Sequence, residues 1–226
     1  PAFKLDNFQR LLGGTKYYAN WMLNSLIVAF AVTAWHVVFD TMAGYAFAKR
    51  RFPGRDVLFW ILLSTLMIPI HVTLIPLYII TRRIGLIDTL GGVILPGTAV
   101  VFGIFLMRQY IQTLPSELEE AARVDGASEF RIFWEIILPL CKPAVAALAI
   151  FTFVRFWNDF LWPLVVTNDP DMRTVQLGLA MFQGRYGTQW TVLMAGTVTA
   201  TLPTLAVFLL GQRWFIQSVA QTGVKG

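Results

Sequence analysis

The residue types that most often carry chemistry are scarce in this chain. It has two histidines, His36 and His71, and one cysteine, Cys141, which excludes an internal disulfide and a cysteine-based zinc site. The Gly-Gly-Thr-Lys stretch at residues 13–16 lacks the spacing of the glycine-rich phosphate loop that binds ATP. The sequence therefore predicts neither a metal-dependent enzyme nor an ATPase built on that loop.

A few polar and charged residues interrupt long apolar stretches: Asn24, His36, Asp40, His71, Arg155, Asn158 and Asp159. Inside a bilayer such groups pair with one another or mark a transport pathway. Arg155 and Asp159 are four residues apart, so we expect them to pair along one helix face and stabilise the fold. Asp40 is expected to pair or to reach toward the membrane surface.

Three of these residues are candidates for a translocation pathway: His71, Asn158 and Asp159. His71 lies between Pro69 and Pro76, and prolines free backbone carbonyls that can line a cavity. For Asn158 a hydrogen bond between helices is the alternative, and for His36 a structural contact with a neighbouring helix is the interpretation we favour.

The composition indicates that lipid surrounds most of the chain. Of its 226 residues 56% are hydrophobic and only 14% are charged, whereas soluble domains carry about 25% charged residues. The net charge of +5 is compatible with nucleic-acid binding, but in so apolar a chain basic residues more often occupy loops. We therefore predict a polytopic membrane protein that does not bind nucleic acid.

Five stretches approach or exceed the roughly 20 apolar residues that a membrane-spanning helix needs. They are residues 21–47, 57–80, 90–110, 143–166 and 190–216. The predicted fold class is an all-α helical membrane bundle that forms a single transmembrane domain over residues 1–226. The chain starts at Pro1 without a methionine or a leader, so we expect a sixth span to precede it.

The distribution of Lys and Arg sets an orientation. Placing the basic segment 49–55 in the cytoplasm puts more Lys and Arg inside than outside. Residues 113–142 and the C-terminus are then cytoplasmic, and residues 1–20 and 168–189 lie on the outer side.

The cytoplasmic segment 113–142 predicts two short helices around a turn. Ser116 and Glu119 have the spacing of a capping box, and Ser128 is placed to cap the second helix. Asp125-Gly126 is a turn signal, because glycine readily takes the left-handed conformation that ends a helix.

Each predicted helix has an apolar face. In the first helix Ala121 and Ala122, near Leu118, make a small and shallow surface that lets another protein approach closely. In the second, one face collects Phe130, Phe133, Trp134 and Ile137. A hairpin that lies on the bilayer surface is the alternative interpretation.

The pattern Glu120-Ala121-Ala122, then Gly126, then Ile136 and Leu138-Pro139 resembles the EAA signature of importer permeases of the ATP-binding-cassette class. The flanking sequence is similar to the sugar-type, maltose-permease-like branch. Segments that carry this similarity are Asn24-Ser25, Tyr45-Ala46, Phe52-Pro53-Gly54-Arg55, Met67-Ile68-Pro69, Ile75-Pro76-Leu77-Tyr78, Trp157-Asn158-Asp159-Phe160, Trp162-Pro163-Leu164 and Gly223-Val224-Lys225-Gly226.

The resemblance implies a multi-pass subunit of a bacterial or archaeal cell membrane, in contact with membrane lipid. Its implied partners are a second permease subunit, in a heterodimer, an ATPase dimer that holds ATP and magnesium, and an extracytoplasmic solute-binding protein. The hairpin would dock on the ATPase through Leu118, Glu120, Ala121, Ala122, Asp125, Gly126, Ile136, Leu138 and Pro139. Gly126→Asp, or a bulky residue at Ala121 or Ala122, is then expected to abolish transport while the protein still inserts.

The outer segment 168–189 would face the binding protein, although a solvated connector explains its composition equally well. The implied substrate is a sugar, and glycerol-3-phosphate or another polyol-type substrate is the alternative. Two other classes fit less well. A membrane-embedded enzyme would leave the hairpin without a purpose, and an ion-driven secondary carrier favours internal repeats that this sequence lacks.

Overall fold

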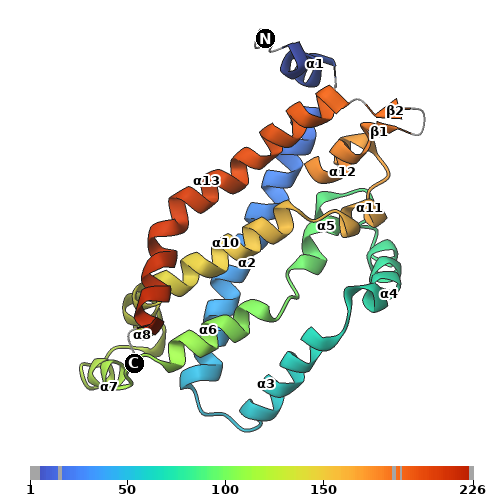
Figure 1. The fold of residues 1–226 in the computed structure, drawn as a ribbon. Helices are drawn as coiled ribbons and strands as arrows, with labels where there is room; N and C mark the ends of the chain where they lie inside the picture. Colours follow the sequence, from blue (N-terminus) through green and yellow to red (C-terminus); the bar gives the residue numbers. More distant parts are fainter. Residues whose placement is uncertain (1–5, 15–16, 185–186, 189, 224–226) are drawn as a thin grey trace. The chain divides into compact units, whose positions relative to one another are not determined.

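The computed structural model describes residues 6–14, 17–184, 187–188 and 190–223, and it is built from helices (Figure 1). In chain order they are α1 (Asp6–Gly14), α2 (Tyr18–Lys49), α3 (Arg55–Ser64), η1 (Thr65–Met67), α4 (Ile70–Arg83), α5 (Leu90–Gly97), α6 (Phe102–Gln112), α7 (Glu117–Val124), α8 (Glu129–Ile132), η2 (Phe133–Ile137), α9 (Leu138–Leu140), α10 (Lys142–Trp157), α11 (Leu161–Val166), η3 (Pro170–Met172), α12 (Val175–Ala180) and α13 (Trp190–Gly223). A two-residue antiparallel pair joins β1 (Gln183–Gly184) to β2 (Gly187–Thr188). Residues 224–226 of the C-terminal signature, and parts of the predicted outer segments, lie outside the described residues.

Two helices are long and apolar enough to cross a bilayer unbroken: α2, and α13 over Trp190–Gln212. Three further helix pairs pass the same test together but bend at a short break, which gives up to five spans. The bends are 99° between Arg55–Met67 and Ile70–Arg83, 41° between α5 and α6, and 77° between Glu129–Leu140 and α10. The helical membrane fold that the sequence predicts is thus confirmed, but several spans are broken helices.

The sharpest bend has a local cause in the sequence. Pro69 disfavours helical geometry at the preceding residue, and Ile68 has the extended angles φ −80° and ψ 115°. At the other end of α3, Gly54 takes φ 78° and starts the helix directly after Pro53.

The predicted fourth span, residues 143–166, is wrong in its second half. α10 ends at Trp157, and α11 begins only at Leu161. The carboxylate of Asp159 faces the backbone N–H groups of Leu161 and Trp162, so it stabilises a new helix start instead of continuing α10.

The chain divides into two compact units. The first holds Pro1–Val32, Thr73–Gly97 and Phe153–Leu209. Its core includes Val28, Val93, Trp162 and Val166, and the Trp162 indole N–H donates to the carbonyl of Gly92 at 2.9 Å. Burying that aromatic ring with its polar N–H satisfied fixes α11 against α5.

The second unit holds Thr33–Val72, Thr98–Thr152 and Leu210–Gly226. Its buried core contains Tyr45, Met107, Ile111, Ala122, Ile132, Phe133, Ile137, Cys141, Ala144 and Leu148. α2 and α6 cross closely at Gly44, where a Cβ atom would lie 2.6 Å from Cβ of Met107. The hairpin therefore packs onto the same core that joins α2, α6 and α10.

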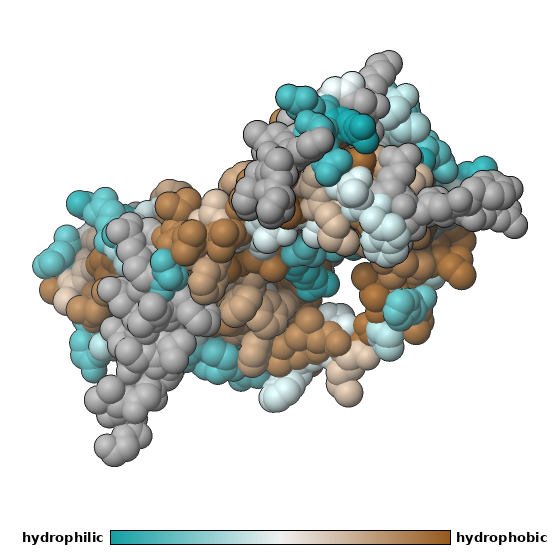
Figure 2. All heavy atoms as spheres, turned by 45° about the horizontal axis from the view of Figure 1, so that its top comes forward, coloured by the Kyte–Doolittle hydropathy of each residue, from teal (hydrophilic) through white to brown (hydrophobic). Residues whose placement is uncertain are grey.

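Large apolar side chains also cover much of the surface, as the hydrophobic colouring in Figure 2 shows. Met67, Trp60 and Ile75 are 84%, 69% and 68% exposed. In water such surfaces are a liability, but lipid solvates them at no cost. This pattern explains how so apolar a sequence folds without a larger core.

Candidate functional site

The hairpin of α7 and α8 has the turn that the sequence predicts. Gly126 has φ 79°, and the N–H of Ala127 bonds the carbonyl of Ala122 at 2.9 Å. Ser128 caps α8, because its hydroxyl oxygen accepts from the N–H of Arg131 at 3.3 Å. A left-handed glycine and a capped second helix thus give the hairpin a defined shape.

The predicted capping box at Ser116 and Glu119 is wrong. Ser116 has helical backbone angles, and its side chain makes no cap hydrogen bond. Instead Lys49, the last residue of α2, donates to the Ser116 hydroxyl at 3.1 Å and to the carbonyl of Leu114 at 2.6 Å. A tertiary contact from α2 therefore ties down the start of α7.

Glu119 points inward and anchors the hairpin to the end of α2. It is 2% exposed, and its carboxylate accepts from the Tyr45 hydroxyl at 3.1 Å and from Arg123 at 3.0 Å. Arg50 lies 3.6 Å away and also pairs with Glu129, which in turn bonds Arg123 at 2.9 Å. These five residues, the anchor network, hold both hairpin helices to α2. Their charges satisfy one another while being partly removed from water.

The outward side of the hairpin is apolar. Val124, Phe130 and Leu118 are 87%, 67% and 42% exposed, and Ala121 lies beside them at the helical spacing of i+3 from Leu118. Glu120, Asp125 and Gly126 are exposed on the same hairpin, as is Pro139 beyond it. An exposed apolar patch with a charged border is a common mark of a protein contact.

Not every predicted docking residue belongs to that outward surface. Ala122 is 9% exposed and packs in the core, while Ile136 and Leu138 are half-buried. A bulky residue at position 122 would therefore overpack the core, so of these two alanines only Ala121 can test docking without disturbing the fold.

The predicted apolar face of the second helix is also wrong. Phe133 and Ile137 are buried, but Phe130 and Trp134 are 67% and 39% exposed, and Ile132 is buried in their place. The reason is a π turn over Phe133–Ile137, which widens the helix so that buried residues recur at Ile132 and Ile137, five apart.

Of the two outcomes that the sequence predicts for Asp40, the structure shows pairing. A hydrogen bond of 2.6 Å joins the Asp40 carboxylate oxygen Oδ2 to Nδ1 of His36, one turn earlier in α2. Both side chains are buried. A Cβ atom on Gly103 of α6 would overlap the Asp40 carboxylate, so this pair sits at a close helix crossing. Asp40 is therefore a buried, paired group and does not reach toward the membrane surface.

The predicted Arg155–Asp159 ion pair does not form among the described residues. Arg155 instead stacks on Phe156, with its guanidinium carbon 5.6 Å from the ring centre. His71 lies in the exposed first turn of α4. Asn158 does bridge two segments, because its side-chain oxygen accepts from Gln176 of α12 at 3.1 Å.

The segment after α11 holds more structure than its turn-rich sequence predicts. α12 buries Val175, Leu177 and Leu179, and Trp21 of α2 donates to the carbonyl of Pro170 at 2.7 Å. The N–H of Val175 bonds the hydroxyl of Ser25 at 2.8 Å. This segment is therefore packed on α2 and is not a mere solvated connector. A six-residue helix is too short to give a clear periodic signal.

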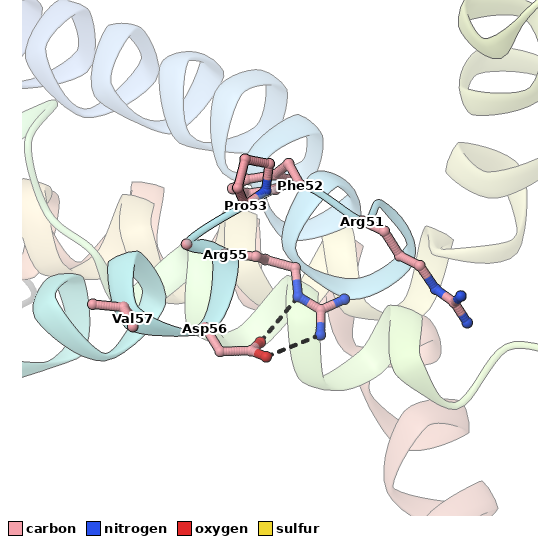
Figure 3. A pocket seen from close by; sticks show the side chains of 7 residues that line it. Arg51, Phe52, Pro53, Arg55, Asp56 and Val57 are labelled. Atoms are coloured by element: carbon pink, nitrogen blue, oxygen red, sulfur yellow. Dashed lines mark hydrogen bonds and ion pairs between the residues drawn. The ribbon is translucent and has the colours of Figure 1, made fainter.

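Two hollows accompany these elements. One, of about 620 Å³, lies at the connection of α2 to α3, where Arg55 binds both oxygens of Asp56 while the Arg51 side chain points away from that pair (Figure 3). The other, of about 590 Å³, lies in the first unit between α12, α13 and the break after α10. The second hollow contains Asn158, one of the predicted pathway residues.

Residues 40–221 match the family described as the binding-protein-dependent transport system inner membrane component. The chain belongs to this family. The permease is 39% identical to the arabinooligosaccharides transport system permease protein AraQ of Bacillus subtilis, over all of this chain and 80% of that protein. It is also 39% identical to the sn-glycerol-3-phosphate transport system permease protein UgpE of Yersinia pestis bv. Antiqua, over 89% of this chain and 72% of that one.

Solved structures agree with this assignment. The permease superposes with a TM-score of 0.83 and 27% identity on a chain of a bacterial ABC transporter involved in the import of the acidic polysaccharide alginate, over 92% of this chain and 79% of that chain. A chain of the MetNI methionine ABC transporter shares the fold, with a TM-score of 0.66 at 18% identity, over 87% of this chain and 94% of that one. The resemblance inferred from the hairpin signature is thereby confirmed.

Of the residues that make up the site, the sequence missed the anchor network and the exposed positions of Val124 and Phe130. The i, i+4 spacing of Glu119 and Arg123 was an available signal for half of that network. The contribution of Arg50 depends on tertiary packing, which no local pattern encodes.

Proposed function

We propose that this permease forms half of the translocation pathway of an ATP-driven importer and couples it to a separate ATPase through the α7–α8 hairpin. A second permease subunit would form the other half, in a heterodimer. ATP and magnesium would bind the ATPase dimer, and an extracytoplasmic binding protein would deliver the substrate. Membership of the family of binding-protein-dependent transport components supports this arrangement.

The observation that carries the coupling role is the two-sided hairpin. Its inner side is fixed to α2 by the buried Glu119, and its outer side presents Val124 and Phe130 to a partner. A coupling element needs both features, because it must keep its shape under load and must also have a surface that the ATPase binds. Closure of the ATPase dimer would push this surface and rock the spans between inward-open and outward-open states.

The proposed orientation places the hairpin, segment 49–55 and the C-terminus in the cytoplasm of a bacterial or archaeal cell. Segment 168–189 then faces the binding protein. The packing of α12 on α2 favours this role. A segment fixed to α2 can pass a displacement caused by the docked binding protein on to that span.

The substrate that we propose is a sugar. Two relatives of equal identity support different substrates, since one is named for arabinooligosaccharides and the other for sn-glycerol-3-phosphate. Glycerol-3-phosphate is therefore the second candidate for the same machinery.

Uptake into sealed vesicles tests the proposed function. The permease is produced with the proteins encoded beside it, and uptake of a labelled arabinooligosaccharide and of sn-glycerol-3-phosphate is measured. We expect uptake of one of them only with ATP and the binding protein present. Uptake that needs neither, and that collapses with an uncoupler, would make the chain an ion-driven carrier instead.

The docking surface has a matched test of its own. Phe130→Ala removes an aromatic ring that is 67% exposed on the hairpin, and Phe208→Ala removes one that is 48% exposed on α13. A buried aromatic anchor at an interface contributes about 2 kcal/mol or more, so we expect Phe130→Ala to weaken ATPase binding by about 30-fold. Equal effects of the two variants on ATPase binding would speak against docking at the hairpin.

A further inference from the structure

We propose that the groove between α12, α13 and the break after α10 binds a neutral, polyhydroxylated ligand and not a phosphorylated one. This inference rests on the proposed function and decides between its two substrate classes. The groove has a volume of about 590 Å³, which lies within the usual range for small-molecule sites. The residues that carry the proposal are Asn158, Phe160, Gln176, Thr197, Thr201 and Thr204.

One wall of the groove is a row of hydroxyls on α13. Thr197, Thr201 and Thr204 follow one another at i, i+4 and i+7, so they share one helix face. Thr197 donates to the carbonyl of Leu193 at 2.9 Å, and Thr201 donates to the carbonyl of Thr197 at 2.8 Å. Because each of these two hydroxyls donates its hydrogen bond within α13, the lone pairs of its oxygen remain to accept hydrogen bonds in the groove.

The facing wall carries an amide pair held in a fixed orientation. Asn158 donates to the carbonyl of Val154 at 2.8 Å and accepts from Gln176 at 3.1 Å. The Gln176 amide still has one N–H and its oxygen to offer, because its one hydrogen bond among the described residues is that to Asn158. Acceptors on one wall and a donor–acceptor amide on the other match sugar hydroxyls, each of which both donates and accepts.

The floor and rim of the groove are apolar. Leu179, Leu193 and Ala200 are buried beneath it, and the ring of Phe160 is 39% exposed at its edge. The C–H-rich face of a sugar ring packs well against such a surface, whereas a small phosphorylated polyol has little apolar area to bury.

Charge separates the two substrate classes most clearly. No Lys, Arg, His, Asp or Glu is among the described residues that line the groove. The nearest charged groups in sequence, Arg155 and Asp159, are not part of that lining, and they interact electrostatically with each other. A phosphate in this groove would lose water without gaining a cationic partner, which is strongly unfavourable.

A cysteine in the hydroxyl row reports occupancy directly. In the intact transporter, Thr201→Cys is labelled with a polar thiol reagent in the presence of an arabinooligosaccharide or of sn-glycerol-3-phosphate. The native Cys141 is 0% exposed and gives little background. We expect the neutral sugar to slow the labelling and glycerol phosphate to leave it unchanged. Protection by glycerol phosphate, or by neither probe, overturns the proposal.

Transport gives the second readout. Thr201→Val removes one hydroxyl at nearly constant volume, and one neutral hydrogen bond corresponds to a roughly two- to tenfold loss of sugar uptake. Thr65→Val is the matched control, because Thr65 also bonds a carbonyl of its own helix turn, that of Leu62 at 2.6 Å, but lies outside the groove. Unchanged uptake in Thr201→Val also overturns the proposal.

The uptake and labelling experiments distinguish a failure of the groove from a failure of the proposed function. If ATP-dependent uptake is intact but the labelling and the Thr201→Val result both speak against the groove, only this inference falls. If uptake needs neither ATP nor binding protein, the proposed function itself is wrong.

Discussion

Glu119→Gln tests whether the anchor network holds the hairpin in place. The change removes a buried charge that accepts from Tyr45 and Arg123 and lies 3.6 Å from Arg50. A hydrogen bond to a charged group contributes about 1.5–3 kcal/mol, and an ion pair with a partly exposed arginine about 0.2–1 kcal/mol. Glutamine retains one acceptor for Tyr45, so we expect a local loss of about 1–2 kcal/mol. The Oε1 atom of Glu119 is buried and has no hydrogen-bond partner among the described residues. The glutamine NH2 group can take the place of this atom without breaking a hydrogen bond, which keeps the net loss small.

Hydrogen exchange measures this loss where it occurs. A local destabilisation of about 1–2 kcal/mol raises the exchange rate of the hairpin amides by about 5- to 30-fold. Exchange in α5 should stay constant. Glu135→Gln is the matched control, because the ion pair of Glu135 with Arg131, at 2.8 Å, is exposed on both sides and contributes little. Unchanged hairpin protection in Glu119→Gln would refute the anchoring role.

Three further changes are predicted from local geometry. Gly44→Val places a Cβ atom 2.6 Å from Cβ of Met107, so thermal unfolding should show a loss of stability of about 1–3 kcal/mol. Gly13→Ala is the control and should show no loss, because a Cβ atom there has no neighbouring atom within 4 Å. Gly126→Asn is expected to keep transport and Gly126→Asp to lose it, because both tolerate a φ of 79° but only the second adds charge to the docking surface; equal transport by the two would contradict this. The backbone N–H groups of residues 169 and 168 lower the pKa of Asp88. The hydrogen bonds to its carboxylate therefore stabilise the fold above about pH 4, and this stabilisation is lost as the pH falls further. The melting-temperature difference between wild type and Asp88→Asn should be constant from about pH 5 to 7 and shrink below about pH 4, and a difference that stays undiminished as the pH falls to about 3 would count against the contact.

The sequence predicts most of the membrane fold because its signals are local and strong. Apolar length locates each of the five stretches, and Pro69 and Gly54 mark two of the breaks. The break at Asn158 is harder to predict, since α10 and α11 are both apolar. Its cause is a side chain, Asp159, that meets backbone N–H groups only once the chain has turned.

In the hairpin, the turn and the second cap were predictable, and the direction of the side chains was not. Gly126 and Ser128 act through their own neighbours in sequence. The inward orientation of Glu119 and Ala122 depends on the core built around Tyr45 and Met107. A π turn then shifts the pattern of the second helix away from the 3.6-residue period that the prediction used.

Cross-linking from the tip of the hairpin tests whether the hairpin docks on the ATPase from the cytoplasmic side. Val124 is 87% exposed, so Val124→Cys should form a cross-link to the ATPase subunit in the intact transporter, and the yield should change when ATP is added. We also expect that a membrane-impermeant thiol reagent added to whole cells does not reach this cysteine. A residue that the reagent labels from outside, with no cross-link to the ATPase, would contradict both the orientation and the coupling role.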